Sequence, residues 1–166
     1  MKIFKQLVLA GILALSAATA GAAGHTIYPA PSQARAALAA ALKTAAATHR
    51  RVLLDFGGNW CPDCQVLDLY FHDATNRPIL AANFVLVDIN IGEMDANLDL
   101  AAQYGIPLHE GVPALAVLSE HGKLLYSQKN GEFEAMRRMQ SSSVTQFLQQ
   151  WRPKRPGCSI VKVNCR

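Results

Sequence analysis

Two cysteines separated by two residues, Cys61 and Cys64, have the clearest chemical potential in this sequence. They lie in the segment Trp60-Cys61-Pro62-Asp63-Cys64, just after the apolar run at 52–56. The C-x-x-C spacing serves zinc sites, structural disulfides and redox-active pairs alike. The surrounding residues must therefore decide among these three kinds of chemistry.

Zinc and a structural disulfide fit the pair less well than redox chemistry does. A structural zinc site needs four ligands, usually from a second C-x-x-C or a pair of histidines. The other two cysteines, Cys158 and Cys165, lie far along the chain, and His72 and His109 have no ligand spacing relative to the pair. A disulfide that closes so short a loop removes little chain entropy, so it would stabilise the fold only weakly. No metal site is predicted.

Redox chemistry requires a stabilised thiolate, and a helix that begins at Cys61 would provide it. Pro62 is tolerated in the first turn of a helix. The unpaired N–H groups and the positive end of the helix dipole at that terminus favour a thiolate, which is the nucleophile. These features predict that Cys61 attacks a disulfide and that Cys64, one turn further on, resolves the resulting mixed disulfide.

The elements that position this pair follow from the apolar pattern. Buried strands are expected where short apolar runs are bounded by turn residues, and helices where apolar residues recur at helical spacing. The predicted helices cover 33–50, 61–70 with a break near 76–78, 94–105, 132–139 and 141–151, and the predicted strands cover 51–56, 83–91, 114–118 and 124–126. This alternation predicts an α/β fold with a central mixed sheet and helices on both faces.

Four features of the sequence resemble the thioredoxin superfamily over residues 33–151. They are the motif W-C-x-x-C, an acid six positions before Cys61 at the end of a strand, the dipeptide Val112-Pro113 before an apolar strand, and the turn His121-Gly122-Lys123. The resemblance implies the thioredoxin fold, with a cis peptide bond before Pro113. It also implies that Cys61, Cys64 and Asp55 are catalytic, with Asp55 as the buried acid that exchanges protons with the resolving cysteine.

The same resemblance implies a substrate-binding surface around the cysteine pair. Its expected residues are Trp60, Pro62, Asp63, Val112 and Pro113. The sequence also departs from the common family pattern. Pro-Asp stands between the cysteines in place of Gly-Pro, Ala114 follows Pro113 where Thr is usual, and the strand at 84–90 has no Lys to pair with the buried acid. These departures concern the substrate and the direction of electron flow.

The first residues predict export. Lys2 and Lys5 precede an apolar run and then small residues, the three-part pattern of a signal peptide, so residues 1–22 are predicted to be cleaved near 20–23. Without these two lysines the formal net charge falls from +4 to about +2. No stripe of basic residues with interleaved aromatics is present, so no nucleic-acid partner is predicted. The expected location is periplasmic or secreted, and a thioredoxin-like domain is expected at 25–152.

The remaining segment, 153–166, is predicted to be a basic tail with its own disulfide. Export permits disulfides, the cysteine count is even, and the turn signal Pro156-Gly157 precedes Cys158. Cys158 and Cys165 are therefore expected to form a structural disulfide; the alternatives are free thiols and a second redox pair.

These observations predict an exported thiol–disulfide oxidoreductase without a cofactor. Asp63 places a negative charge beside Cys61, which disfavours the thiolate and favours a reductase over an oxidant. The expected partners are exported proteins that contain disulfides, with a membrane thiol-relay protein as the electron donor. The alternative is a thioredoxin-like metallochaperone or assembly factor that binds copper or a partner through the same cysteines, because copper(I) prefers thiolates. A disulfide-reduction assay with and without bound copper separates the two.

Overall fold

The computed structural model describes residues 26–154. The predicted signal peptide, the cleavage region and the two tail cysteines, Cys158 and Cys165, lie outside the described residues. Among residues 26–154, no helix is long and apolar enough to cross a membrane.

A four-stranded mixed sheet forms the centre of the described chain. Its strands are β1 (Arg51–Gly57), β2 (Phe84–Asn90), β3 (Ala114–Leu118) and β4 (Leu124–Ser127), in the spatial order β2-β1-β3-β4. β1 pairs with β2 in parallel and with β3 antiparallel, and β3 pairs with β4 antiparallel. The central position of β1 explains its continuous apolar sequence, since both of its faces are covered.

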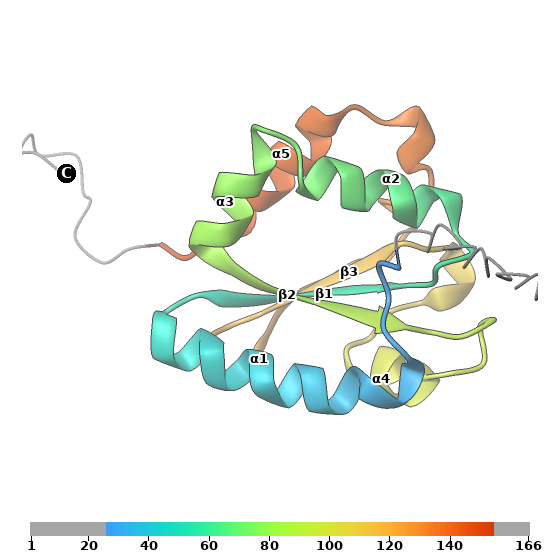
Figure 1. Cartoon of the computed structure of the whole chain (residues 1–166), viewed down its shortest axis with the longest axis horizontal. Helices are drawn as coiled ribbons and strands as arrows, with labels where there is room; N and C mark the ends of the chain where they lie inside the picture. Colours follow the sequence, from blue (N-terminus) through green and yellow to red (C-terminus); the bar gives the residue numbers. More distant parts are fainter. Residues whose placement is uncertain (1–25, 155–166) are drawn as a thin grey trace, which may run out of the picture.

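Helices cover both faces of this sheet (Figure 1). One face carries α1 (Ala34–Thr48) and α4 (Leu98–Gln103), and the other carries α2 (Pro62–Phe71), α3 (Asn76–Asn83) and α5 (Ser141–Trp151). Short 3₁₀ turns lie at Pro31–Gln33 (η1), Leu108–Glu110 (η2) and Met136–Arg138 (η3). This three-layer arrangement confirms the predicted α/β class and the thioredoxin fold.

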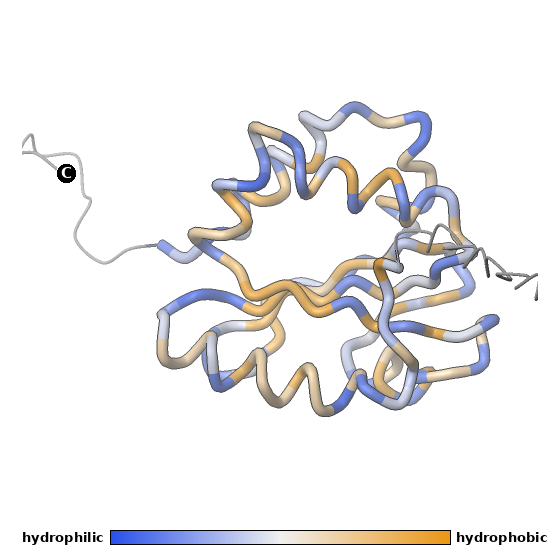
Figure 2. Tube along the Cα trace, in the orientation of Figure 1, coloured by the Kyte–Doolittle hydropathy of each residue, from blue (hydrophilic) through white to orange (hydrophobic). Residues whose placement is uncertain are grey.

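Successive residues of β1 point to opposite sides of the sheet, so the core has two parts. Val52, Leu54 and Phe56 pack on the α1 side, whereas Leu53 packs with Leu67 and other residues on the α2 side. Figure 2 shows these central strands as the most hydrophobic part of the trace. The alternation also places Asp55 on the α2 side, the side on which the cysteine helix lies.

Three of the helix predictions were wrong, two in their boundaries and one in the type of structure. The helix predicted at 61–70 was expected to break near 76–78, but α2 already ends at Phe71, and a further helix, α3, begins at Asn76. The Asp73 carboxylate accepts hydrogen bonds from the N–H groups of Thr75 and Asn76. Pro78 then falls in the first turn of the new helix. A backbone N–H at that position would have no acceptor within the helix, so its absence in proline costs no hydrogen bond.

The helix predicted at 94–105 is shorter than expected, because Met94 and Asn97 have positive φ angles of 69° and 55° and the helix begins only at Leu98. The helix predicted at 132–139 is replaced by turns and the short η3. There the Arg137 N–H donates to the Asp63 carboxylate of another element, and it makes no helical hydrogen bond of its own. Tertiary contacts therefore override helix propensity in both segments.

Candidate active site

The cysteine pair lies at the N-terminus of α2, as expected. Cys61 is the N-cap, its sulfur accepts a hydrogen bond of 3.1 Å from the Cys64 N–H, and Pro62 occupies the first turn. Cys61 and Cys64 form a disulfide with α-carbons 5.3 Å apart, and both residues are buried. The helix terminus therefore directs backbone N–H groups and the positive end of its dipole at the Cys61 sulfur.

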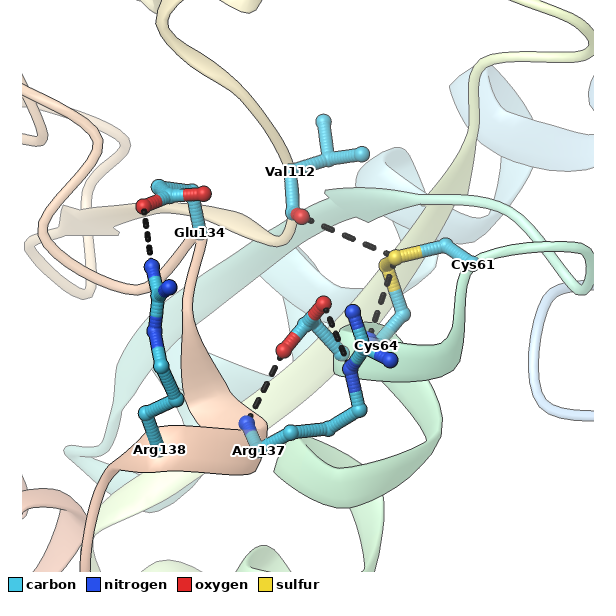
Figure 3. A network of polar contacts seen from close by, with 7 residues as sticks. Cys61, Cys64, Val112, Glu134, Arg137 and Arg138 are labelled. Carbon is cyan, nitrogen blue, oxygen red and sulfur yellow. Dashed lines mark hydrogen bonds and ion pairs between the residues drawn. A yellow bond between two sulfur atoms is a disulfide. The ribbon is translucent and has the colours of Figure 1, made fainter.

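The loop before β3 faces this pair. The peptide bond between Val112 and Pro113 is cis. The Val112 carbonyl oxygen lies 3.6 Å from Cys61 Sγ, as Figure 3 shows. The structure thus brings the cis-proline loop, through the Val112 carbonyl, against Cys61.

A buried glutamine that sequence reasoning missed fixes this loop. Gln128 is only 1% exposed, its Oε1 accepts from the Leu115 N–H, and its Nε2 donates to the Pro113 carbonyl. Two side-chain hydrogen bonds thus hold the chain on both sides of Ala114. Because Gln128 follows a strand and precedes a polar turn, nothing in the sequence distinguishes it from a solvent-exposed loop residue.

Gln128→Leu is expected to lower the free energy of unfolding by about 1–3 kcal/mol, since the Leu115 N–H would lose its buried acceptor. Urea denaturation of the oxidised protein measures this. Gln149→Leu on the exposed side of α5 is the control and should change stability by less than about 0.5 kcal/mol. Equal effects of the two variants would contradict the role of Gln128.

Trp60 borders the cysteines on the surface side. Its side chain is 43% exposed, and its Nε1 donates to the Gly92 carbonyl at 2.6 Å. Met94, 40% exposed, lies two residues beyond that carbonyl. The tryptophan is therefore held in a fixed position while part of its surface stays exposed beside the cysteines.

Asp63 is paired, which the sequence did not indicate. Its carboxylate accepts from the backbone N–H of Arg137 at 2.9 Å and from Arg137 Nε at 3.1 Å. The two residues also line a hollow of about 310 Å³ together with Glu134, Ala135 and Arg138. Figure 3 shows this charged group beside the disulfide. The segment around η3 thus supplies a cation that partly balances the charge between the cysteines.

Asp55 lies beneath the pair in a group of acidic side chains. It is 1% exposed, and its direct neighbour across the β1–β2 ladder is Asp88. Burial raises the pKa of Asp55 well above its usual range, and the negative charges of Asp88 and Asp68 raise it further, whereas a hydrogen bond from Tyr28 lowers it. A buried carboxyl whose pKa is raised in this way holds its proton to higher pH than an ordinary aspartate does.

Asp88 also titrates far from its ordinary range. Burial, followed by the charge of Asp68, raises its pKa to about 7, and His72 opposes this shift. The sequence showed that the strand at 84–90 has no Lys, but it did not single out Asp88 as the carboxylate that lies opposite Asp55. The signal that could have identified Asp88 was its position, since it lies in register with Asp55 on the neighbouring strand.

Two further observations delimit the site. Among residues 26–154, no group of three or more His, Cys, Asp and Glu side chains is arranged to hold a metal ion. A hollow of about 770 Å³ lies at the other end of the sheet, beside Arg50, Arg51 and Lys154, and no predicted site residue lines it.

A disulfide at a helix N-terminus, a cis-proline loop facing it and a buried acid beneath it, all on this fold, define a thiol–disulfide oxidoreductase. The thioredoxin-like family model matches residues 33–119, more than half of the chain. The chain belongs to the thioredoxin-like family.

Comparison with solved structures agrees with this assignment. A disulphide isomerase from Xylella fastidiosa Temecula1 is similar, with 34% identity and a TM-score of 0.73, over 77% of this chain and 98% of that one. The C-terminal domain of DsbD from Neisseria meningitidis shares the fold, with 21% identity and a TM-score of 0.50, over 70% of this chain and 95% of that domain. No curated protein matches the chain.

Proposed function

We propose that this oxidoreductase is exported and acts as a reductase of disulfides in partner proteins. The N-terminal pattern of basic, apolar and small residues supports export. The observation that carries the direction of electron flow is the position of Asp63 between the cysteines, in the first turn of α2. Its negative charge disfavours a thiolate on Cys61 and so makes the dithiol a better electron donor.

Each predicted site residue has a role in this proposal. Cys61 attacks the partner's disulfide, and Cys64 resolves the mixed disulfide. An extended segment of the partner lies along Val112 and Pro113 and exchanges backbone hydrogen bonds with Val112. Trp60 offers apolar surface to the same segment. No bound cofactor takes part, and a membrane thiol-relay protein restores the dithiol.

Asp55 is the proton acceptor for Cys64 in this proposal. The buried position of its carboxyl on the α2 side of β1 supports the role, because Cys64 is buried on the same side. Asp63 contributes through its charge, and its ion pair with Arg137 limits that contribution. Pro62 shapes the first turn, which keeps both sulfurs within bonding distance.

The reduction potential tests the proposed direction. We expect a value near that of thioredoxin, about −270 mV, and Asp63→His should raise it by about 30 mV or more, since this removes a charge that opposes the thiolate. Equilibration with glutathione redox buffers measures both. Asp99→His is the matched control, because Asp99 also pairs with an arginine, Arg35, but lies on α4 across the sheet.

A wild-type potential above about −180 mV would make the protein an oxidant and overturn the proposed direction. The control should leave the potential unchanged. A disulfide-reduction assay with and without bound copper(I) tests the metallochaperone alternative. In that alternative Cys61 and Cys64 bind copper in place of exchanging electrons with a disulfide.

A further inference from the structure

Three asparagine side chains tie the segment before α1 to the end of the sheet at which the cysteine pair lies. We call residues 27–31 the N-terminal strap. Asn59 Oδ1 accepts from the N–H groups of Ile27 and Tyr28, both at 3.0 Å, and Asn59 Nδ2 donates to the Tyr28 carbonyl at 2.8 Å. The same side chain therefore satisfies three backbone groups of the strap, as a neighbouring strand would.

Two more asparagines hold the rest of the strap. Asn90 Nδ2 donates to the Pro29 carbonyl at 2.8 Å, and Asn97 Nδ2 donates to the Pro31 carbonyl at 2.9 Å. Figure 1 shows the strap in blue, crossing the end of the sheet at which α2 begins before it enters α1. The strap is thus fixed at both ends against the loops that follow β1 and β2.

This attachment inserts Tyr28 beneath the cysteine pair. Tyr28 is 1% exposed and packs in one apolar cluster with Cys61 and Cys64. Its hydroxyl donates a hydrogen bond of 2.8 Å to Asp55 Oδ2. A Cβ atom built on Gly57 would overlap the Tyr28 hydroxyl and lie 2.8 Å from Cys64 Sγ. The hydroxyl and the resolving sulfur therefore border the same small space over β1.

We propose that Tyr28 is a positioning residue for the carboxyl of Asp55, and that its hydroxyl sets the pH range in which Cys64 resolves mixed disulfides. This inference rests on the proposed function, because it needs Asp55 as the proton acceptor. It assigns a catalytic consequence to the N-terminal strap, in which the sequence pattern indicated no site residue.

The resolving step shows why this hydrogen bond matters. In the mixed disulfide, the Cys64 thiol gives its proton to the Asp55 carboxylate, and the Cys64 thiolate attacks Cys61 Sγ. The bond between Cys61 and Cys64 forms, the bond from Cys61 to the substrate breaks, and the electron pair leaves with the substrate sulfur as a thiolate. The substrate has gained two electrons and the cysteine pair has lost two. The step requires an ionised Asp55 at its start.

The Tyr28 hydrogen bond favours this ionised form. Asp55 is the one buried side chain among residues 26–154 with an unpaired polar atom, because its Oδ1 has no hydrogen-bond partner there. Burial and the charges of Asp88 and Asp68 raise the pKa of Asp55, and the Tyr28 hydrogen bond lowers it. Removal of the hydroxyl would therefore raise this pKa further.

The other charged groups around Asp55 come from two elements. β2 contributes Asp88, and α2 contributes Asp68, which pairs with His72 at 3.1 Å. Tyr28 itself remains a phenol at working pH, since burial and the nearby Asp55 charge raise its pKa well above 10.0. The Tyr28 phenol therefore differs from the two carboxylates. It donates a hydrogen bond to Asp55, and it keeps its proton throughout the pH range of the reaction.

Tyr28→Phe tests the proposal, because it keeps the ring packing and removes only the hydroxyl. The readout is the single-turnover rate of reduction of a disulfide-containing peptide at saturating concentration, measured against pH. The acid limb of this profile should move up by about one pH unit. On that limb the rate should fall about tenfold, whereas at alkaline pH it should equal the wild-type rate.

Tyr70→Phe is the matched control, since the Tyr70 hydroxyl donates to the Met139 carbonyl and contacts no carboxylate. Its profile should coincide with wild type. Asn59→Ala releases the strap without altering Tyr28 and should shift the limb in the same direction. The pKa of Asp55, followed by carboxyl carbon NMR in the oxidised protein, should rise in Tyr28→Phe, and this readout needs no activity.

Two results overturn the inference. They are a Tyr28→Phe profile that coincides with wild type, and a rate lowered equally at every pH, which is what a purely structural role would produce. Failure of the proposed function looks different. In that case the wild-type protein itself would not reduce the peptide at any pH, while the NMR shift would still report the link between Tyr28 and Asp55.

Discussion

Cys64→Ser is expected to accumulate stable mixed disulfides with partner proteins, and Cys61→Ser is expected to accumulate none. Cys61 is the N-cap of α2, where the helix terminus favours its thiolate, and it faces the Val112 carbonyl. Without Cys64 the attack still occurs, but no thiol is present to break the new bond. Disulfide reduction should fall to the background rate in both variants.

The experiment is best done with Cys158→Ser and Cys165→Ser present in every variant, so that the tail cysteines cannot form or resolve adducts. Non-reducing gels of exported proteins, followed by mass spectrometry, detect the adducts. The double tail variant alone is the control and should keep its reductase activity. Equal trapping by Cys61→Ser and Cys64→Ser would contradict the assigned order, and loss of activity in the tail control would show a second redox pair.

Asp55→Asn is expected to stabilise the oxidised protein while slowing its catalysis. The pKa of Asp55 is raised in the folded protein, so the folded state holds a proton more tightly than the unfolded chain does. Stability is therefore lost as pH rises above the ordinary aspartate value toward the raised one. The neutral amide removes this loss and still offers Tyr28 an acceptor oxygen.

The free energy of unfolding of Asp55→Asn is expected to exceed that of wild type at slightly alkaline pH and to equal it at about pH 4. Reductase activity at neutral pH should fall at least about tenfold, since the proton acceptor is gone. Urea denaturation at both pH values and a reductase assay measure the two effects. Asp88→Asn should share the gain, because the pKa of Asp88 is raised to about 7.

Asp99→Asn, an exposed carboxylate on α4, is the control and should change stability by less than about 0.5 kcal/mol at either pH. A lower stability of Asp55→Asn at alkaline pH would show that the ionised carboxylate is not destabilising. An unchanged reductase rate would show that Asp55 is not the proton acceptor, whatever its effect on stability.

The sequence by itself determined the reactive pair and the elements around it. The spacing of Cys61 and Cys64, the proline between them and the apolar run that precedes them are local signals, since a helix terminus and a buried strand are each formed within a few residues. The same local signals placed Asp55 at the end of β1. Turn residues and apolar runs also predicted all four strands of the sheet, and hence its mixed topology.

The helix at 132–139 failed for a non-local reason. Its residues have adequate helix propensity, but Phe133 and Met136 are drawn into the core and the Arg137 N–H is used by Asp63, 74 positions earlier. Propensity is a weak term, and a few buried contacts and one charged hydrogen bond exceed it. The additional helix α3 has a local signal instead, because the Asp73 carboxylate accepts hydrogen bonds from the Thr75 and Asn76 N–H groups at its start.

Only the tertiary structure decided what surrounds the reactive groups. Tyr28 reaches Asp55 from 27 positions away, Arg137 reaches Asp63 from 74, and Gln128 reaches the Pro113 carbonyl from 15. A sequence pattern records which side chains are present, but the pKa of a buried acid and the balance of charge beside a thiol depend on distances across the fold. Those distances are set by how the strap, the sheet and the helices pack together. No short stretch of the sequence determines that packing.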